Sequence, residues 1–558
     1  MPITRRFMLI AAVLFILITS PTAAQRSPRT PTLVAAVGDA DQTSAVLWIH
    51  SPNVGALAVS LTPTVTLPAA AISDPLLPVK LDLSGLSAGT VYTYQITDAG
   101  GLTLNGSFRT PAPPDVQRGL RFGITGDWQA AFMPYIVVRN APAHALDFFV
   151  LLGDTVYADV TSPDVPLRQA QTLAQFRAKH AENMLTVNDL NLWRDIYQTT
   201  PIYATLDDHE ITDDFAGGAP PASDNRFDRR GAYIHDTALF QNGYQAFLDY
   251  MPIRAEVWGA TGDPRTAGKP NLYRYRTFGK DAALFVLDAR TFRDASLASP
   301  SARGATDPAA IRTFLNKAYD PTRTMLGAAQ LAQLKADLLA AQAAGILWKV
   351  IAVPQPIQQF GVFNAGDRFE GYAAERADLL DFMVRNGITN AVFVAADFHG
   401  TFVNNLTYAL TPGDPQIETG YFEIVTGAVA VDPPFGTLAV TAFRALGAIS
   451  QTQYNLYQAA PRALKDTFAE VGLNTLLMAS GYDPLGLVGS GIAYEWITGG
   501  NVLAHTFGWT AFEIDAEGVL TVTTYGIPAP TPAEIRADPT AYLAYQPEVL
   551  QQFRVTPR

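Results

Sequence analysis

Six apolar runs of strand length, alternating with helical stretches, constrain the fold of this chain more than any other feature of its sequence. The runs occupy residues 120–125, 146–152, 201–206, 282–287, 346–353 and 390–396. Strands that are apolar on both faces are typical of a sheet with helices packed on each side. The segments before the last two runs place apolar residues three and four positions apart and end at a glycine that can cap a helix. Residues 116–558 are therefore predicted to form an α/β domain, an α/β/α sandwich with a helical C-terminal elaboration.

Residues 32–111 show a different pattern of short runs, in which apolar and polar residues alternate between Pro, Gly and Asp turns. Without a long helical period, this pattern predicts a small β-sandwich. The string LSAGTVY, residues 86–92, resembles the tyrosine-corner segment of fibronectin type III domains. PAPPD, residues 111–115, follows as a stiff linker because clustered prolines favour an extended backbone. We expect a domain boundary at this linker.

Composition excludes several classes of protein. Hydrophobic residues make up 48% of the chain and charged residues 16%, which is the opposite of a disordered chain. The net charge of -12 argues against a general nucleic-acid-binding role. The chain has no cysteine, so disulfides, cysteine-ligated metals and thiol nucleophiles are excluded. A bound metal would have to use oxygen and imidazole ligands.

The N-terminus predicts export. Arg5 and Arg6 precede an apolar run at residues 7–18, and small residues follow up to Ala24. This order is typical of a signal peptide, residues 1–24, and the paired arginines also suit a twin-arginine signal. A membrane anchor is the less favoured alternative, since a span needs about 20 apolar residues. We expect a secreted protein, periplasmic or extracellular.

Acidic and histidine residues follow the apolar runs. The candidate residues at these strand ends are Asp127, Asp154, Tyr157, Asp207, Asp208, His209, Asp288, Gln355, Asp397 and His399. Ligands of open α/β sheets bind at the carboxyl ends of the strands, so these side chains are expected to converge. Several carboxylates in one place repel one another unless cations neutralise them. The pattern predicts a site for two metal ions.

Spacing within the motifs supports this prediction. Asp397 and His399 are two residues apart and can point the same way from an extended segment. Tyr157 favours ferric iron, since a +3 ion can hold a phenolate deprotonated. The glycines before Asp127 and Asp154 allow close backbone approach. Taken singly, each motif has a plainer interpretation as a turn or a helix cap. Their combination favours a metal centre.

Five ordered motifs resemble the alkaline phosphatase D (PhoD-like) family of metallophosphoesterases. They are GDTVYAD (153–159), LDDHEITDDF (206–215), VLDARTFRD (286–294), DRFEGYAAERADLL (367–380) and VAADFHG (394–400). The resemblance covers most of residues 33–405. It implies a metallophosphoesterase-type (calcineurin-like) catalytic domain after a small β domain. It also implies Fe3+ together with Ca2+ as cofactors, secretion, and hydrolysis of phosphate monoesters and diesters, with some relatives acting on phospholipids.

Carried over by motif, the resemblance assigns metal ligands. Asp154 would bridge the two ions, Tyr157 and His399 would bind the iron, and Asp397 and Asp208 would lie on or near the second ion. Asp127 stands where many family members have a cysteine, and it is the natural substitute as a ligand.

The remaining assignments concern catalysis and substrate binding. His209, next to Asp208, resembles the histidine that hydrogen-bonds phosphate oxygens in this group, and the pair are the predicted catalytic residues. Arg290 and Gln355 are predicted to bind substrate, with ion pairs to local acids as the alternative role for Arg290. A metal-activated hydroxide is expected to attack phosphorus in line.

Two other functions stay open. One is a phospholipase D-like diesterase on the same centre, and the other is a non-catalytic surface protein that the metal only stabilises. The apolar stretch 437–482 is expected to form helices over the mouth of the site. Contact with a membrane through this stretch is possible but not predicted. The partner we expect is a phosphoester substrate, and the sequence makes no prediction of oligomeric state.

Overall fold

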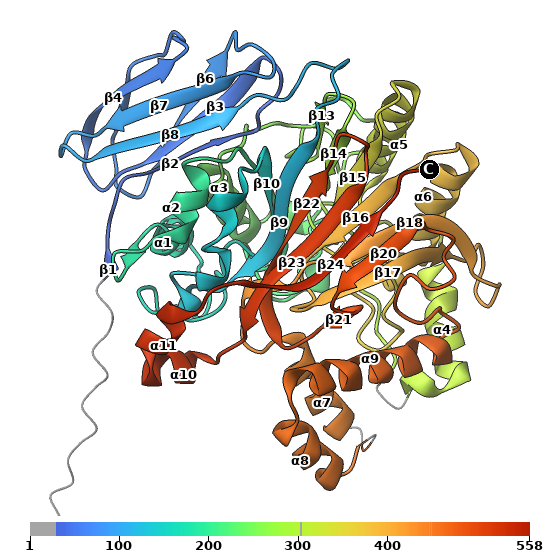
Figure 1. The fold of residues 1–558 in the computed structure, drawn as a ribbon. Coiled ribbons are helices and arrows are strands. Elements are labelled where there is room, and N and C mark those ends of the chain that lie inside the picture. Colours follow the sequence, from blue (N-terminus) through green and yellow to red (C-terminus); the bar gives the residue numbers. More distant parts are fainter. Residues whose placement is uncertain (1–28, 302–303, 446, 448) are drawn as a thin grey trace, which may run out of the picture.

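The structure is a computed structural model that describes residues 29–301, 304–445, 447 and 449–558 (Figure 1). The predicted signal peptide, residues 1–24, lies outside the described residues and stays a prediction. Among the residues that are described, we find no helix with the length and apolar character that a membrane crossing requires.

Two large sheets form the centre of the molecule. Along the first sheet the strands are β20 (Tyr494–Thr498), β24 (Glu548–Val555), β23 (Leu520–Pro528), β22 (Thr506–Ile514), β9 (Leu120–Trp128), β10 (Phe148–Leu152), β12 (Ile202–Thr205), β2 (Val34–Gly38), β3 (Ser44–His50) and β6 (Val79–Ser84), with β19 (Ala428–Ala430) also paired to β9. Along the second they are β13 (Arg274–Phe278), β14 (Ala282–Val286), β15 (Trp348–Ala352), β16 (Ala391–Ala395), β18 (Ile417–Val425), β17 (Thr401–Tyr408) and β21 (Val502–Leu503). The strands β9, β10 and β12 run parallel, as do β14, β15, β16 and β18.

The six predicted strands thus divide between two sheets, and the expected α/β/α arrangement is wrong in its number of layers. The sheets pack face to face over a shared core that includes Phe122, Val150 and Val350. Phe149 and Leu151, which alternate with Val150 along β10, face a helix layer instead. A strand between a helix layer and a second sheet is apolar on both faces, just like a strand between two helix layers. The apolar pattern therefore could not distinguish the two arrangements.

Helices cover the outer faces of both sheets (Figure 1). Against the first sheet lie α1 (Leu173–Asn183), α2 (Leu192–Tyr197) and α3 (Ala238–Tyr250). Against the second lie α5 (Ala328–Ala343) and α6 (Ala373–Arg385). The order of layers is helix, sheet, sheet, helix. Other elements are β1 (Arg29–Thr30), β11 (Thr186–Val187), α4 (Pro308–Ala318), α10 (Pro532–Ala537) and α11 (Pro539–Ala544).

The N-terminal strands form two sheets around a core of their own. The strands β2, β3 and β6 face β5 (Ala70–Ile72), β4 (Gly55–Thr62), β7 (Val91–Thr97) and β8 (Thr103–Arg109). In the tyrosine-corner segment, the Tyr92 hydroxyl accepts a hydrogen bond of 2.9 Å from the backbone N–H of Ser87. The β2–β3–β6 sheet also continues the first large sheet, because Gly38 pairs with Ile202. The domain boundary at residues 111–115 stays a prediction.

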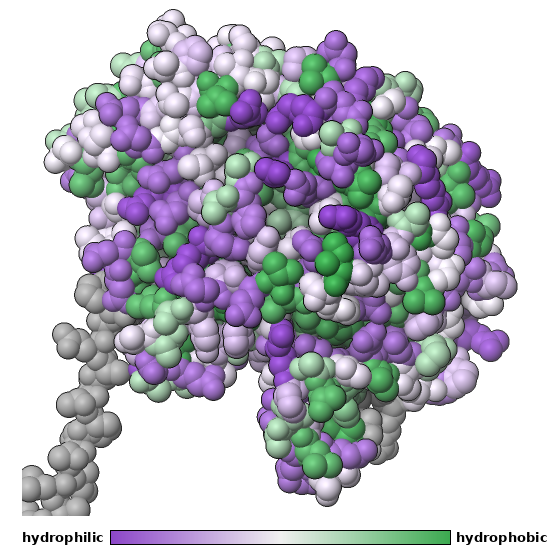
Figure 2. Space-filling model, viewed as in Figure 1, coloured by the Kyte–Doolittle hydropathy of each residue, from purple (hydrophilic) through white to green (hydrophobic). Residues whose placement is uncertain are grey.

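The helices expected over residues 437–482 are confirmed as α7 (Phe435–Ala445), α8 (Gln451–Ala459) and α9 (Arg462–Ala479). They form a lobe at the bottom of Figure 1, and the space-filling view in Figure 2 shows hydrophobic residues on its surface. Leu438, Leu456 and Leu464 are among the exposed apolar side chains of this lobe.

Candidate metal centre

The carboxyl ends of the parallel strands of both sheets meet at one edge of the molecule. A Cβ atom on Gly126, in β9, would lie 2.7 Å from the Cβ atom of Ala396, which follows β16. A Cβ atom on Gly153 would lie 2.4 Å from the backbone nitrogen of Asp207. The expected close approach at these two glycines is confirmed. Because of it, the residues that follow strands of different sheets come together.

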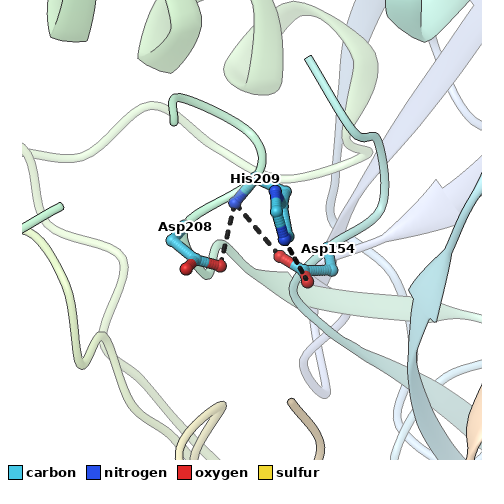
Figure 3. A group of neighbouring side chains, drawn as sticks. All are labelled: Asp154, Asp208 and His209. Carbon is cyan, nitrogen blue, oxygen red and sulfur yellow. Dashed lines mark hydrogen bonds and ion pairs between the residues drawn. The ribbon is translucent and has the colours of Figure 1, made fainter. Parts of the chain in front are cut away.

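Asp154, Asp208 and His209 form the first cluster of potential ligands (Figure 3). The backbone N–H of His209 donates to Asp154 Oδ1 at 3.2 Å and to Asp208 Oδ1 at 3.0 Å. Asp208 also belongs to a second cluster with Asp207 and Asp397. Within each cluster the ligand atoms lie within 4.8 Å of one another, a separation that a shared metal ion can bridge.

The other predicted ligands lie beside these clusters. His399 Nε2 lies 3.7 Å from Asp127 Oδ1. The buried ring of Tyr157 stacks on that of His209 with a centroid distance of 4.2 Å. The structure therefore brings together every residue that the sequence predicted as a metal ligand. Asp213 and Asp214 form a third, more exposed cluster with Asp208.

Four of these residues adopt a strained backbone. The φ angles of Asp127, Asp154, Asp397 and His399 are 63°, 49°, 64° and 52°, in the left-handed region that residues other than glycine seldom occupy. Such strain costs of the order of 1–3 kcal/mol per residue and gathers at functional sites. Its presence in four residues at three strand ends supports a functional role for this edge.

The charges of the centre are unbalanced. Burial raises the pKa of Asp127 well above its ordinary value, and the neighbouring carboxylates of Asp207 and Asp208 raise it further. Burial likewise raises the pKa of Asp154 well above normal. Burial also acts on Asp208, but the charges of Arg290 and His209 outweigh it and lower the pKa of that carboxyl. The charge of His209 also acts on Asp127 and Asp154 but does not outweigh burial there, and Arg290 is not among the main causes that act on these two carboxyls.

The donor set fits bound cations. Both carboxylate oxygens of Asp127 are buried and form no hydrogen bond with any residue that the structure describes. Burial lowers the pKa of His399 to about 4, so its ring is neutral and has a lone pair for a metal. Carboxylate, imidazole and phenol groups are ligands for hard or borderline metal ions, and no thiol is present.

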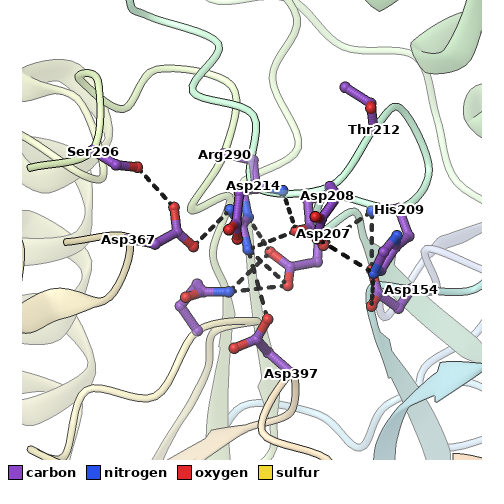
Figure 4. Close-up of polar contacts among 12 residues, drawn as sticks. Asp154, Asp207, Asp208, His209, Thr212, Asp214, Arg290, Ser296, Asp367 and Asp397 are labelled. Atoms are coloured by element: carbon purple, nitrogen blue, oxygen red, sulfur yellow. Dashed lines mark hydrogen bonds and ion pairs between the residues drawn. The ribbon is translucent and has the colours of Figure 1, made fainter. Parts of the chain in front are cut away.

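Arg290 and Gln355, two of the residues predicted to bind substrate, contact acidic side chains, and Figure 4 shows Arg290 among its acidic partners. The buried Arg290 guanidinium pairs with Asp207 at 2.5 Å, with Asp208 at 3.3 Å and with Asp367 at 3.1 Å. Gln355 Nε2 donates to Asp207 Oδ2 at 3.1 Å. The alternative role predicted for Arg290, ion pairs to local acids, is the one that the structure shows. Substrate binding by Arg290 and Gln355 stays a prediction.

The sequence assigned no role to three residues that orient the centre, although Glu210 is among the residues that end the third apolar run. Asp159 Oδ1 lies 2.7 Å from His209 Nδ1 and fixes the orientation of that ring. Glu210 accepts hydrogen bonds from the backbone N–H groups of Asp154 and Asp207 at 3.1 and 3.0 Å. Asp367 pairs with Arg290 from the other side. All three lie inside the motifs quoted above, but nothing in their local spacing indicated these partners.

Asp288 has a structural role instead. Its Oδ1 accepts hydrogen bonds of 2.9 Å from the backbone N–H groups of Arg290 and Thr291, so it closes the turn after β14. This aspartate follows its strand as the others do, but it is absent from the ligand clusters of the described residues.

A cavity of about 950 Å³ opens beside the acids. Asp213, Asp214, Asp367, Asp397 and His399 line its polar end. Apolar side chains of α7 and α9 also line the cavity. The site therefore has room for a molecule of substantial size next to its potential metal ligands.

The fold and the site together define an α/β protein with an acidic, metal-type centre at the carboxyl ends of its strands. A family model described as PhoD-like phosphatase matches residues 125–468, a span that contains every predicted ligand. This match covers more than half of the chain, and the chain belongs to the PhoD-like phosphatase family.

Two known proteins extend this comparison. Alkaline phosphatase D of Bacillus subtilis (strain 168) is 26% identical over 350 residues, which are 59% of this chain and 54% of that relative. The match therefore spans about half the length of the curated relative. A solved structure titled "Structure of PhoD" superposes with a TM-score of 0.63 at 18% identity and covers 89% of this chain and 86% of the solved one. That likeness shows a shared fold.

Proposed function

We propose that the protein is an exported, metal-dependent phosphoester hydrolase acting on phosphate monoesters or diesters. The observation that carries the proposal is the convergence of Asp127, Asp154, Asp208, Asp397 and His399 within a PhoD-like phosphatase domain. Fe3+ together with Ca2+ are the proposed cofactors. Bound there, they would supply positive charge that neutralises the acids and stabilises the negative charge of a phosphoryl group.

The predicted ligands form two sets that have Asp154 in common. Asp127, Asp154, Tyr157 and His399 would hold one ion. Asp154, Asp208 and Asp397 would hold the other. Four of these residues are already fixed by their backbone conformation, so little reorganisation accompanies binding.

His209 is the proposed contact to the phosphate. Asp159 engages its Nδ1 atom, while its Nε2 atom lies 4.0 Å from Asp154 Oδ2 and 3.9 Å from Asp213 Oδ1, beyond hydrogen-bond distance. Nε2 is therefore the ring nitrogen left to contact a phosphate oxygen or the leaving group.

Three finer assignments belong to the same proposal. Residues 1–24 would direct export and be removed. Residues 32–111 would be a fibronectin type III-like domain, supported by the two packed sheets and the Tyr92 contact. Residues 116–558 would be a catalytic domain of the metallophosphoesterase type, supported by the strand-end site.

The test combines metal content with turnover. The mature chain is analysed by plasma mass spectrometry and assayed with para-nitrophenyl phosphate and bis-para-nitrophenyl phosphate, with and without added calcium. Asp154→Ala and His399→Ala should each lose bound metal and activity together, and Asp228→Asn, an exposed acid distant in sequence from every ligand, should lose neither. Full activity in either ligand variant, or stoichiometric metal with no turnover of any ester in the unchanged protein, would refute the proposal.

A further inference from the structure

The cavity next to the acids continues into an aromatic wall. Phe398 stands between the two proposed ligands Asp397 and His399 in the chain and lines the cavity. Its ring stacks on Phe360 with a centroid distance of 4.0 Å and on Phe435 with one of 4.9 Å. The apolar surface therefore begins directly at the residues that would hold metal and phosphate.

The lobe of α7 and α9 extends this wall away from the acids. Leu438 and Phe443 of α7 and Leu473 and Leu476 of α9 line the same cavity. Leu438 lines the cavity and is 45% exposed. When an apolar group covers an exposed leucine, apolar surface is removed from water, and this burial favours binding.

Hydrogen bonds connect the lobe of α7, α8 and α9 to the residues of the site. The first backbone N–H of α7, that of Phe435, donates to the carbonyl oxygen of His399 at 2.9 Å, and His399 Nδ1 lies 3.3 Å from the carbonyl oxygen of Pro433. Asp466 of α9 accepts from His505 Nδ1 at 2.6 Å, and the His505 ring also contacts the Tyr457 hydroxyl of α8. The apolar wall thus keeps a defined position relative to the phosphate end.

We infer that this cavity selects phosphoesters that carry an unbranched alkyl group of several carbons. The phosphoryl group would lie against the acids and His399, and the alkyl group along the wall that begins at Phe398 and ends at Leu438 and Leu476. This inference rests on the proposed phosphoester hydrolysis. A volume of about 950 Å³ is that of a pocket for a whole small molecule, so the phosphoryl group alone leaves most of it to the ester group.

A homologous series of substrates tests the inference. The methyl, butyl and hexyl esters of para-nitrophenyl phosphate share one leaving group, and water adds to phosphorus as the P–O bond to nitrophenolate breaks, leaving an alkyl phosphate. Burial of a methylene is expected to raise kcat/KM by about fourfold for each carbon that reaches the wall. Equal kcat/KM values across the series would overturn the inference and leave the proposed function standing.

Matched leucine variants locate the effect. Leu438→Gln should lower the ratio of kcat/KM for the hexyl ester to kcat/KM for the methyl ester by about threefold or more. Leu456→Gln on α8, at a leucine that is 68% exposed and absent from the cavity lining, should leave this ratio unchanged. Both leucines are exposed, so both variants are expected to fold. The same response in both variants would overturn the assignment of the wall.

A binding measurement decides the inference independently of turnover. Hexylphosphonate and methylphosphonate are titrated into the metal-loaded protein by calorimetry. Tighter binding of hexylphosphonate, lost in Leu438→Gln, supports the inference, and equal affinities overturn it. If no ester is hydrolysed, including para-nitrophenyl phosphate, the proposed function fails, and this titration alone then decides whether the cavity binds alkyl groups.

Discussion

Between pH 7 and pH 5, the free energy of unfolding should fall by about 2 kcal/mol less in the His180→Phe variant than in the unchanged protein. His180 of α1 is buried, and its ring stacks on Tyr250 at a centroid distance of 5.2 Å. On the other side His50 of β3 lies 5.8 Å from the same tyrosine ring. These histidines lie where the N-terminal strands meet the helix layer.

Burial lowers the pKa of His180 to about 3 and that of His50 to about 4. Because unfolded histidine has a pKa of about 6.5, the unfolded chain binds more protons than the folded one below that value. Stability therefore falls as the pH drops below about 6.5, and the loss levels off below each folded pKa. From neutral pH to pH 5 each histidine contributes a loss of about 2 kcal/mol, or about 4 kcal/mol together.

The assay is urea unfolding followed by circular dichroism at pH 5, 6 and 7 and constant ionic strength. Acidic groups elsewhere titrate equally in the unchanged protein and the variants, so the difference in pH dependence isolates each histidine. His144→Phe is the control, since His144 is only half-buried and should change the slope by less. If His180→Phe and His50→Phe both keep the pH dependence of the unchanged protein, the argument from burial is refuted.

Two further predictions concern other contacts. Asp39→Asn should destabilise the protein by about 3–5 kcal/mol, because it leaves the buried Arg274 guanidinium, 2.9 Å away, without its carboxylate. As a control in the same urea assay, Asp82→Asn removes an exposed carboxyl 3.5 Å from Arg254 and should cost about 1 kcal/mol or less. Asp159→Asn should lower kcat about 10- to 100-fold at unchanged metal content by mass spectrometry, because the His209 ring loses its orienting carboxylate; an unchanged kcat would show that this contact does not serve catalysis.

The strand ends were predictable because their signal is local in the chain. An apolar run followed at once by Gly-Asp, or by Asp-Phe-His, indicates where a strand ends. Parallel strands bring the residues at their carboxyl ends to one edge, whatever the order of the strands in the sheet. This is why Asp127, Asp154 and Asp397 were identified without knowing which strands are neighbours. The rule also over-predicts, as Asp288 shows, since a carboxylate that closes its own turn gives the same sequence pattern.

The division into two sheets could not be predicted, because it depends on which strands pair with one another, and the apolar pattern of a strand does not give its neighbour. The contacts of Arg290 and Gln355 depend in the same way on distant parts of the chain. Both face Asp207, which lies 83 residues from Arg290 and 148 from Gln355 in the chain. Asp159 likewise reaches His209 across 50 residues. A short motif gives the identity of a polar side chain, while only the folded chain gives the group that it contacts.

The cations around the acids are unevenly distributed. Arg290 neutralises one side of the centre, where it pairs with Asp207, Asp208 and Asp367. Among the residues that the structure describes, no lysine or arginine forms an ion pair with Asp127 or Asp154. His209 Nε2 lies 4.0 Å from Asp154 Oδ2, and the neutral ring of His399 lies 3.7 Å from Asp127 Oδ1. The chain therefore supplies its own countercharge on the Arg290 side, whereas the proposed ions would supply it beside Asp127 and Asp154. The proposed metal ions would be needed most at Asp127 and Asp154, where no arginine pairs with the acids. The prediction that Arg290 binds phosphate has less support, because Arg290 already balances Asp207, Asp208 and Asp367.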